Sequence, residues 1–440
     1  MTTTVVSLPE LPTGLEFEEF ISAFLQVGGL YIERNVIDRG AEEVLELDVI
    51  TTDYDSSPPE IKLLEMKAGK WGFSEIFKLR GWLDYLNFQS ALLVVRKGRT
   101  NIDFVRNKAK TLNIDIAVID DLSKAESALN DFYAISGVDK RDVNYWRFSY
   151  WLERKLLARL THKKKSGTAK CHRALEKDYY DISSGIFFTE NIVERGEKLY
   201  EVYQRNPRIS AKCANEMSGG SFDDPADNLP KKIYQETYYG CKYNDIQIST
   251  FVEHRARLSL LKSAVDYILY ERAGITGKVK RHIKFIGGKE LEIPSLTFLP
   301  SSFISGLKKI SKHKYFHRYP IFWQWFLWFF GGFILLDFEQ EEYKLMSEKT
   351  GIPVEEIPNA LSVYDIMFPL NSSWFMDLNP NTNIKLLRMH SVPFMGVGAN
   401  VRRLYYTSSY EFDDLSLSKK YTKSNLVNWN NLFVEVLSTH

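Results

Sequence analysis

The hydrophobic periodicity of the first 130 residues changes in an order that limits the folds open to this chain of 440 residues. Residues 14–28 place apolar side chains at helical spacing, with glutamates between them, and end at Gly28-Gly29. Three strand patterns follow, and then a helix, a strand, a second helix and a last strand. The expected ranges are Tyr31–Val36, Val44–Ile50, Ile61–Ala68, Ser74–Asn87, Ala91–Val95, Phe104–Leu112 and Ile114–Ile119. This order predicts an α/β domain over residues 1–130, a mixed sheet flanked by helices.

Charged side chains occupy matching places on the second and third strands. In the second strand, alternation puts Asp48 on one face and its apolar neighbours Leu47 and Val49 together on the other. In the third strand, Glu65 and Lys67 share a face. We therefore expect an aspartate and a Glu-x-Lys pair to meet at one edge of the sheet.

These residues suit metal-assisted hydrolysis of phosphodiester bonds. We expect Mg²⁺, with Mn²⁺ as a substitute, because such hard cations prefer one or two carboxylates together with water and substrate phosphate. Asp48 and Glu65 would supply the carboxylates, and the main-chain carbonyl of Met66 a third oxygen. The metal would activate a water molecule, while Lys67 orients that water or stabilises the transition state. Glu18, in the preceding acidic helix, would bind a second metal or hold a metal-bound water.

The bare acid-x-Lys triplet carries little information, because about four would occur by chance in such a chain. The alternative interpretation is that Asp48, Glu65 and Glu18 are ordinary solvated side chains, or belong to an inactive copy of a nuclease. The structural context of the triplet, on neighbouring strands behind an acidic helix, favours the catalytic interpretation.

The surrounding sequence resembles a known superfamily. GLEFEEF in the first helix, LELDVI in the second strand and LLEMKAG in the third are followed by a helix and the strand ALLVV. Over about residues 12–125 this pattern resembles the PD-(D/E)xK restriction-endonuclease-like superfamily, and its Mrr-like and Holliday-junction-resolvase-like nucleases in particular. The resemblance implies Asp48, Glu65 and Lys67 as the catalytic set, with Glu18 as the helix glutamate. No proline precedes Asp48, and Glu65 stands where Mrr-like members often carry glutamine.

Charge is distributed unevenly along the chain. Residues 1–130 hold 14 basic and 21 acidic side chains, a net charge of −7, and residues 131–440 carry +8. Because Lys and Arg contacts to phosphates supply much of the affinity for nucleic acids, we expect the basic remainder to hold or gate the DNA. Each candidate is alternatively an ordinary solvated side chain. The candidates are Lys70 beside Trp71, the cluster Lys163, Lys164 and Lys165, the segment Lys278–Lys284, and the cluster Lys308, Lys309 and Lys312.

Beyond residue 130 the periodicity is mostly helical. We expect a larger, mainly helical α+β region over residues 131–440. Tyr145–Leu160 and Leu258–Tyr270 have the spacing of amphipathic helices. Ile283–Ile286 and Leu291–Ile293 flank two glycines as the strands of a hairpin do.

Two segments of this region could be mistaken for functional elements. Residues 342–361 hold a helix, a turn at Gly351 and a second helix, as in a helix-turn-helix motif, but Pro358 in the second helix favours ordinary helical packing. Residues 321–336 are apolar and very aromatic. They are broken by Gly331-Gly332 and shorter than the roughly 20 residues that span a bilayer. We expect a buried core helix there, and no membrane contact.

Cysteine content and the first residues indicate a compartment. Cys171, Cys213 and Cys241 are too few and too scattered for a disulfide framework, and they form no C-x-x-C pair for zinc. The first seven residues lack the basic and apolar segments of a signal peptide. We therefore expect a cytoplasmic protein.

The leading functional hypothesis is a Mg²⁺-dependent DNA endonuclease, a prokaryotic restriction or phage-defence effector. Residues 1–130 would cut and residues 131–440 would recognise or gate. No G-x-x-x-x-G-K-[ST] motif is present, so we expect no ATP-driven motor in this chain. Two alternatives stay open. The C-terminal region would dock an activating subunit, such as a short Argonaute with its guide, or a second copy of the chain; or the protein is a non-catalytic DNA-binding regulator on a nuclease-like scaffold.

Overall fold

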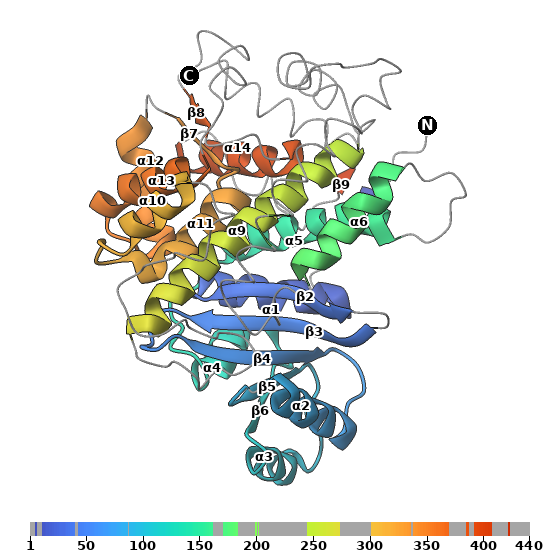
Figure 1. The fold of residues 1–440 in the computed structure, drawn as a ribbon. Coiled ribbons are helices and arrows are strands. Elements are labelled where there is room, and N and C mark those ends of the chain that lie inside the picture. Colours follow the sequence, from blue (N-terminus) through green and yellow to red (C-terminus); the bar gives the residue numbers. More distant parts are fainter. Residues whose placement is uncertain are drawn as a thin grey trace.

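The computed structural model describes thirteen parts of the chain and arranges them in two layers (Figure 1). These parts are residues 5–6, 11–39, 43–86, 88–161, 170–183, 199, 201, 244–272, 301–335, 338–368, 384–386, 391–406 and 421–422. Three of the sequence predictions lie outside the described residues, namely the Ile283–Ile293 hairpin and the basic segments Lys163–Lys165 and Lys278–Lys284.

The first layer follows the order expected from the sequence. It comprises α1 (Leu15–Val27), β2 (Tyr31–Arg39), β3 (Glu43–Asp53), β4 (Glu60–Lys67), α2 (Phe73–Leu86), β5 (Ala91–Val95), α3 (Ile102–Lys110), β6 (Ile114–Val118), the 3₁₀ helix η1 (Leu122–Lys124) and α4 (Ala125–Asn130). The strand order in the sheet is β2-β3-β4-β5-β6. Strands β2, β3 and β4 are antiparallel neighbours, and β5 and β6 run parallel to β4. The expected mixed sheet flanked by helices is confirmed.

Strand β5 shows why the sheet has helices on both faces. All five of its residues are apolar and buried. Leu92 and Val94 join a hydrophobic cluster with α1, whereas Leu93 and Val95 join a second cluster with α2 and α3. A strand that is apolar on both sides has to be covered on both sides. Helix α2 supplies part of this cover with buried side chains at helical spacing, Ile76, Leu79, Leu83 and Leu86.

The second layer is mainly helical and includes two small sheets. Its elements are α5 (Lys140–Thr161), α6 (Lys170–Ser183), α9 (Asn244–Arg272), α10 (Ser301–Ile310), η2 (Phe316–Arg318), α11 (Tyr319–Trp328), β7 (Phe333–Leu335), α12 (Glu339–Thr350), η4 (Val354–Glu356), α13 (Ile357–Met367), β8 (Ile384–Leu386) and α14 (Val392–Tyr406). Strand β7 pairs with β8, and β1 (Val5–Val6) pairs with β9 (Tyr421–Thr422). This agrees with the mainly helical region expected after residue 130.

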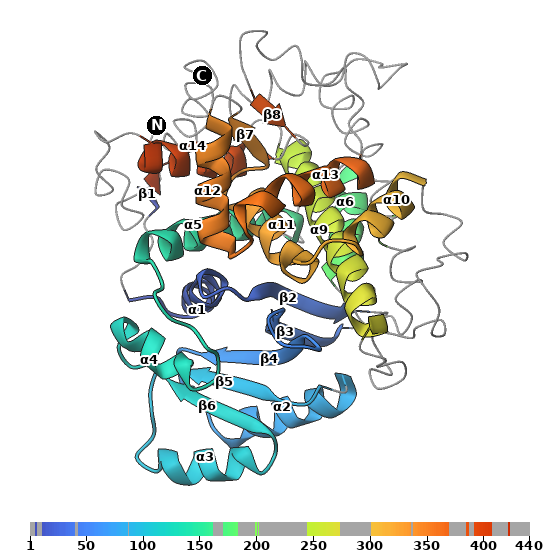
Figure 2. The same ribbon diagram turned by 90° about the vertical axis from the view of Figure 1, so that its left-hand side faces the viewer.

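The two layers share one hydrophobic core. A single cluster of buried side chains runs from Phe17 of α1 and Leu64 of β4 to Trp146 of α5, Phe251 of α9 and Phe322 of α11. Figures 1 and 2 both place the helical layer over α1 and β2, with β5, β6, α2 and α3 on the far side. The change of periodicity near residue 130 therefore marks a change of secondary structure, and the packing continues across it.

The aromatic segment is buried as expected, but its helix is shorter than expected. Helix α11 ends at Trp328, and the chain continues as strand β7. Gly331 and Gly332 between them have φ angles of 73° and 76°, which L side chains rarely adopt. A Cβ atom at Gly331 would also lie 2.9 Å from main-chain atoms of Met395 and Phe394. Among the described helices, none is both long enough and apolar enough to cross a bilayer.

The candidate helix-turn-helix is packed into the helical layer. Gly351 ends α12 with a φ of 68°, and Arg318 lies so close that a Cβ atom at Gly351 would be 2.8 Å from its guanidinium. Pro358 is in the first turn of α13, where its missing N–H is tolerated. More than half of α13 is buried, which leaves it little surface for DNA and favours ordinary packing. The buried side chains are Ile357, Ala360, Leu361, Val363, Tyr364 and Met367.

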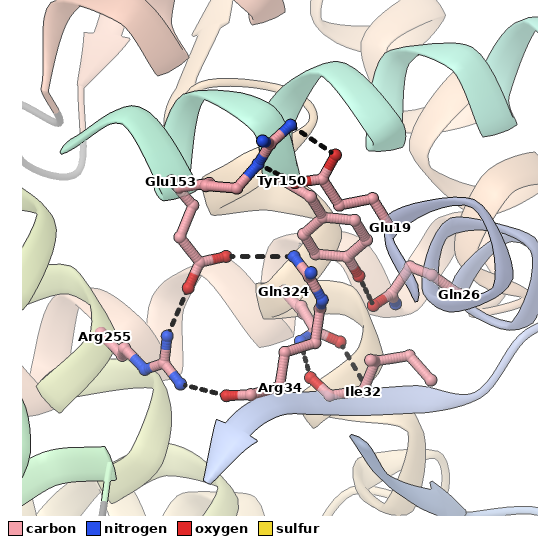
Figure 3. A network of polar contacts seen from close by, with 9 residues as sticks. Glu19, Gln26, Ile32, Arg34, Tyr150, Glu153, Arg255 and Gln324 are labelled. Atoms are coloured by element: carbon pink, nitrogen blue, oxygen red, sulfur yellow. Dashed lines mark hydrogen bonds and ion pairs between the residues drawn. The ribbon is translucent and has the colours of Figure 1, made fainter. Parts of the chain in front are cut away.

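The edge strand β2 is held to the helical layer by the single glutamine of α11 (Figure 3). The side-chain oxygen of Gln324 accepts the Ile32 N–H at 3.2 Å, and its amide nitrogen donates to the Ile32 carbonyl at 2.7 Å. An edge strand presents unpaired main-chain groups, and buried groups of this kind are costly if unsatisfied. Gln324 therefore supplies hydrogen-bond partners for both main-chain groups of Ile32 on the edge strand that the aromatic helix covers.

A buried group of charges lies beside this contact, also in Figure 3. Glu153 of α5 is 3.8 Å from Arg34 of β2 and also pairs with Arg255 of α9. Arg255 donates in turn to the Arg34 carbonyl at 2.9 Å. On the other side of α5, Arg154 donates to both carboxylate oxygens of Glu19 in α1. Helix α5 is thus linked by charge to both β2 and α1.

We predict that Gln324→Leu lowers the free energy of unfolding by about 2 kcal/mol or more, because it leaves the buried N–H and carbonyl of Ile32 without partners. Urea denaturation followed by tryptophan fluorescence measures the change. The matched control is Gln89→Leu, at an exposed position. Equal effects of the two substitutions would contradict the role given to Gln324.

Candidate active site

An opening forms in the middle of the sheet where β3 and β4 part. Their pairing ends at Val49 and Leu64, after which β3 continues beside β2 and β4 continues beside β5 as far as Lys67. At the start of the opening, the Met66 N–H donates to the Asp48 carboxylate at 2.9 Å. The side chain of Asp48 thus takes the place of a main-chain acceptor, and this bond fixes the carboxylate between the two strands.

The backbone changes face at this point. The expectation that Leu47 and Val49 share one face is wrong, because Leu47 packs in the cluster on the α2 side and Val49 in the cluster on the α1 side. Simple alternation requires a regular strand. Asn35 of β2, which lies opposite Asp48, has a φ of 50°, a left-handed conformation that asparagine tolerates better than most residues. This irregularity lets Asp48 enter the opening.

Glu65 is the most enclosed charged group of the opening, with 0% of its surface exposed. One carboxylate oxygen, Oε1, receives two lysines, Lys67 Nζ at 2.5 Å and Lys78 Nζ at 2.9 Å. Within the described part of the chain, the other oxygen, Oε2, is buried and has no hydrogen-bond partner. The two oxygens of this carboxylate therefore differ: one binds two lysines, and the other has no partner among the described residues.

Lys78 was not anticipated from the sequence. It belongs to α2, whereas Lys67 belongs to β4. The signal that could have found it is the short loop of residues 68–72, which obliges the following helix to pack back onto the strand it leaves. Lys78 of this helix then pairs with Glu65, whereas the Glu-x-Lys motif contains only Lys67 of the strand.

The carboxylates of the opening perturb each other. Burial raises the pKa of Asp48 to about 7, and the negative charges of Glu65 and Glu18 add to the effect. Burial also raises the pKa of Glu18, against the opposing charges of Arg34 and Lys67. Burial acts to lower the pKa of Lys67, but its ion pair with Glu65 outweighs this and raises it, so that Lys67 stays a cation. The site is a partly buried group of three carboxylates held against the positive charges of Lys67 and Lys78.

The structure brings four predicted residues, Glu18, Asp48, Glu65 and Lys67, into electrostatic contact. Lys70 is exposed in the loop that follows β4.

The other described basic candidates lie elsewhere. Lys308 and Lys312 are exposed, and Lys309 donates to Ser362 at 2.6 Å. They belong to α10 and the turn after it, in the helical layer above β2 in Figures 1 and 2, whereas β4 lies below β2. The structure does not bring this cluster to the carboxylates.

Comparisons of the chain with models of protein families, with curated proteins and with solved structures find no match. The functional interpretation accordingly rests on the residues of the site and their geometry.

We predict that Asp48→Asn stabilises the metal-free protein by about 1–3 kcal/mol at pH 8 and much less at pH 5. The pKa of Asp48 is about 7 in the folded chain, above its ordinary value of 3.8. The folded state thus holds this proton more tightly than the unfolded state, and the contribution of Asp48 to stability falls as pH rises between these two values. Asparagine keeps an oxygen acceptor for the Met66 N–H and cannot ionise.

Thermal melting in EDTA at both pH values measures this difference, with Glu46→Gln as the control because Glu46 is exposed on the same strand. Adding Mg²⁺ at pH 8 is expected to raise the melting temperature of the wild type and not of Asp48→Asn. A pH-independent difference between the wild type and Asp48→Asn would contradict the burial of an ionisable Asp48.

Proposed function

We propose that this protein is a Mg²⁺-dependent endonuclease that hydrolyses the phosphodiester bonds of DNA, on a restriction-endonuclease-like fold. The observation that carries the proposal is the opening between β3 and β4. There Asp48 is fixed by the Met66 N–H, Glu65 is buried with one oxygen free of protein partners, and Lys67 is held as a cation. Two carboxylates and a lysine in this arrangement are what metal-assisted phosphoryl chemistry requires.

The residues of the opening fit a divalent cation. The Oε2 atom of buried Glu65 has no protein partner among the described residues, and a cation bound beside Asp48 would favour the ionised form of that carboxyl, whose pKa burial and the charges of Glu65 and Glu18 raise. In the described ranges no three His, Cys, Asp or Glu side chains form a ready-made metal cage. The two carboxylates present, Asp48 and Glu65, suit Mg²⁺ or Mn²⁺, which use one or two carboxylates and complete their shell with water and substrate phosphate.

Asp48 and Glu65 would hold the metal, and Glu18 lies near enough to act on both through its charge. The metal would supply Lewis-acid stabilisation of the scissile phosphate and a more acidic attacking water. Lys67, fixed by Glu65, places a positive charge where the phosphate oxygens gain negative charge during the reaction. Lys78, with 42% of its side chain exposed, reaches the same carboxylate from α2 and adds a second positive charge at the mouth of the opening.

The helical layer supports a gating role for residues 131–440. Arg154 of α5 binds Glu19, whose neighbour Glu18 is in the candidate site. Any displacement of α5 would therefore pull on α1 and on Glu18. This contact favours the version of the proposal in which residues 131–440 gate cleavage.

We predict that Asp48→Ala, Glu65→Ala and Lys67→Ala each reduce plasmid cleavage in Mg²⁺ by about 10²-fold or more, because each removes a group that acts on the metal or on the transition state. Agarose-gel assays of supercoiled DNA measure nicking and linearisation, and EDTA should abolish both. Glu46→Ala is the matched control, an exposed acid on the same strand as Asp48. Cleavage by Asp48→Ala or Glu65→Ala at the wild-type rate, or cleavage that persists in EDTA, would refute the assignment.

A further inference from the structure

Two loops beside the opening carry exposed basic side chains and are fastened to each other. The loop after β4 holds Lys70 and Trp71, and the loop after β5 holds Lys97 and Arg99. The indole N–H of Trp71 donates to the Lys97 carbonyl at 2.8 Å, and the Arg99 guanidinium lies 5.7 Å from the centre of the Trp71 ring. Lys70, Lys97 and Arg99 are all exposed. Residues 68–72 and 96–101, which contain Lys70, Trp71, Lys97 and Arg99, are called the paired basic loops below.

The topology of the sheet puts the paired basic loops next to the candidate site. Strands β4 and β5 are parallel, so both loops follow the carboxyl ends of their strands at the same end of the sheet. Lys67 is the last residue of β4, and the Arg96 N–H donates to its carbonyl at 3.0 Å. Lys70 follows Lys67 by three residues, a reach of about 10 Å at most. A strand of nucleic acid with its scissile phosphate at Lys67 would pass over these loops.

The charge of the paired basic loops is opposite to that of the region they belong to. Residues 68–72 and 96–101 contain Lys70, Arg96, Lys97 and Arg99 and no acidic residue, whereas residues 1–130 as a whole carry a net charge of −7. Arg96 is engaged with the Pro12 carbonyl. Three exposed cations, Lys70, Lys97 and Arg99, therefore remain at the end of the sheet where β4 delivers Lys67.

We propose that the paired basic loops bind the phosphate backbone of the nucleic acid that enters the opening, an inference that rests on the proposed nuclease function and names its substrate contact. Lys and Arg are the side chains that bind phosphates in nucleic-acid interfaces, and arginine does so through a planar fork. Trp71 holds the loop of Lys97 by its hydrogen bond and lies within cation–π range of Arg99, so that it connects the two loops. The acidic first layer would thereby bind the nucleic acid through its own loops. The basic side chains of α10 are not needed for these phosphate contacts.

The test uses the full chain, a fluorescently labelled DNA duplex and EDTA, so that binding is measured without cleavage. The test variant is Lys97→Gln with Arg99→Gln. The matched control is Lys108→Gln with Lys110→Gln, which removes the same charge from exposed positions in the last turn of α3, where the chain leads to the start of β6. Fluorescence anisotropy over a range of salt concentrations gives the dissociation constant and its salt dependence.

The loop variant is expected to bind about tenfold or more weakly than the wild type, and its log–log salt slope is expected to be shallower by about 0.9 for each lost phosphate contact. The α3 control is expected to change affinity less than twofold and to keep the wild-type slope. Equal behaviour of the two variants, or no DNA binding by the wild type, would overturn the inference. An acidic protein as the true occupant of the loops would appear as unchanged DNA binding and would overturn it as well.

Failure of this inference can be told apart from failure of the proposed function. If the wild type cleaves plasmid DNA in Mg²⁺ and the loop variant binds and cleaves as the α3 control does, the nuclease function stands and the loop site does not. If the loop variant loses binding while the wild type never cleaves with any divalent cation, the loops bind nucleic acid and the hydrolytic function fails.

Discussion

The hydrogen bond between the Met66 N–H and the Asp48 carboxylate is the contact on which the candidate site depends. It lies where β3 and β4 part, and it replaces a main-chain bond with one to a side chain. The sheet stays intact because β3 keeps its pairing with β2 and β4 keeps its pairing with β5. An opening is thus created in the centre of the sheet, in which Glu65 is fully buried and Asp48 and Glu18 are partly buried. Burial and the charges of Glu65 and Glu18 raise the pKa of Asp48. A cation bound there would favour the ionised form of Asp48.

The helical layer packs directly against the sheet and α1, and it positions elements of the candidate site. The core runs without a break from α1 into α5, α9 and α11, and Gln324 satisfies the edge strand that those helices cover. Arg154 and Glu153 of α5 tie α1 and β2 to the same helix. The helix that carries Glu18 is therefore positioned by residues from the second layer, which gives a physical route by which events in residues 131–440 reach the site.

Much of the first layer could be predicted, because each element there has a strong periodic signal and because Asp48, Glu65 and Lys67 fall on neighbouring strands. The change of face at Asp48 could not, since it depends on a left-handed Asn35 in another strand. Lys78 was missed because its role arises from the packing of α2 and not from spacing in the motif. The composition of residues 321–336 predicts their burial. It does not predict where the helix ends, because that depends on the close contacts of Gly331 with residues distant in the sequence. Clustering in the sequence favours the lysines of α10, whereas the place of Lys97 and Arg99 beside the site follows from where β5 ends in the sheet.

The central claim is that the opening between β3 and β4 is a divalent-metal site built from Asp48 and Glu65. The most direct measurement is anomalous diffraction from crystals of the protein soaked in Mn²⁺. The account predicts an anomalous peak within ligand distance of both carboxylates, with the free Oε2 of Glu65 among its ligands, and loss of that peak in Asp48→Ala. A peak elsewhere in the molecule, or saturating Mn²⁺ with no peak between these two side chains, would contradict it.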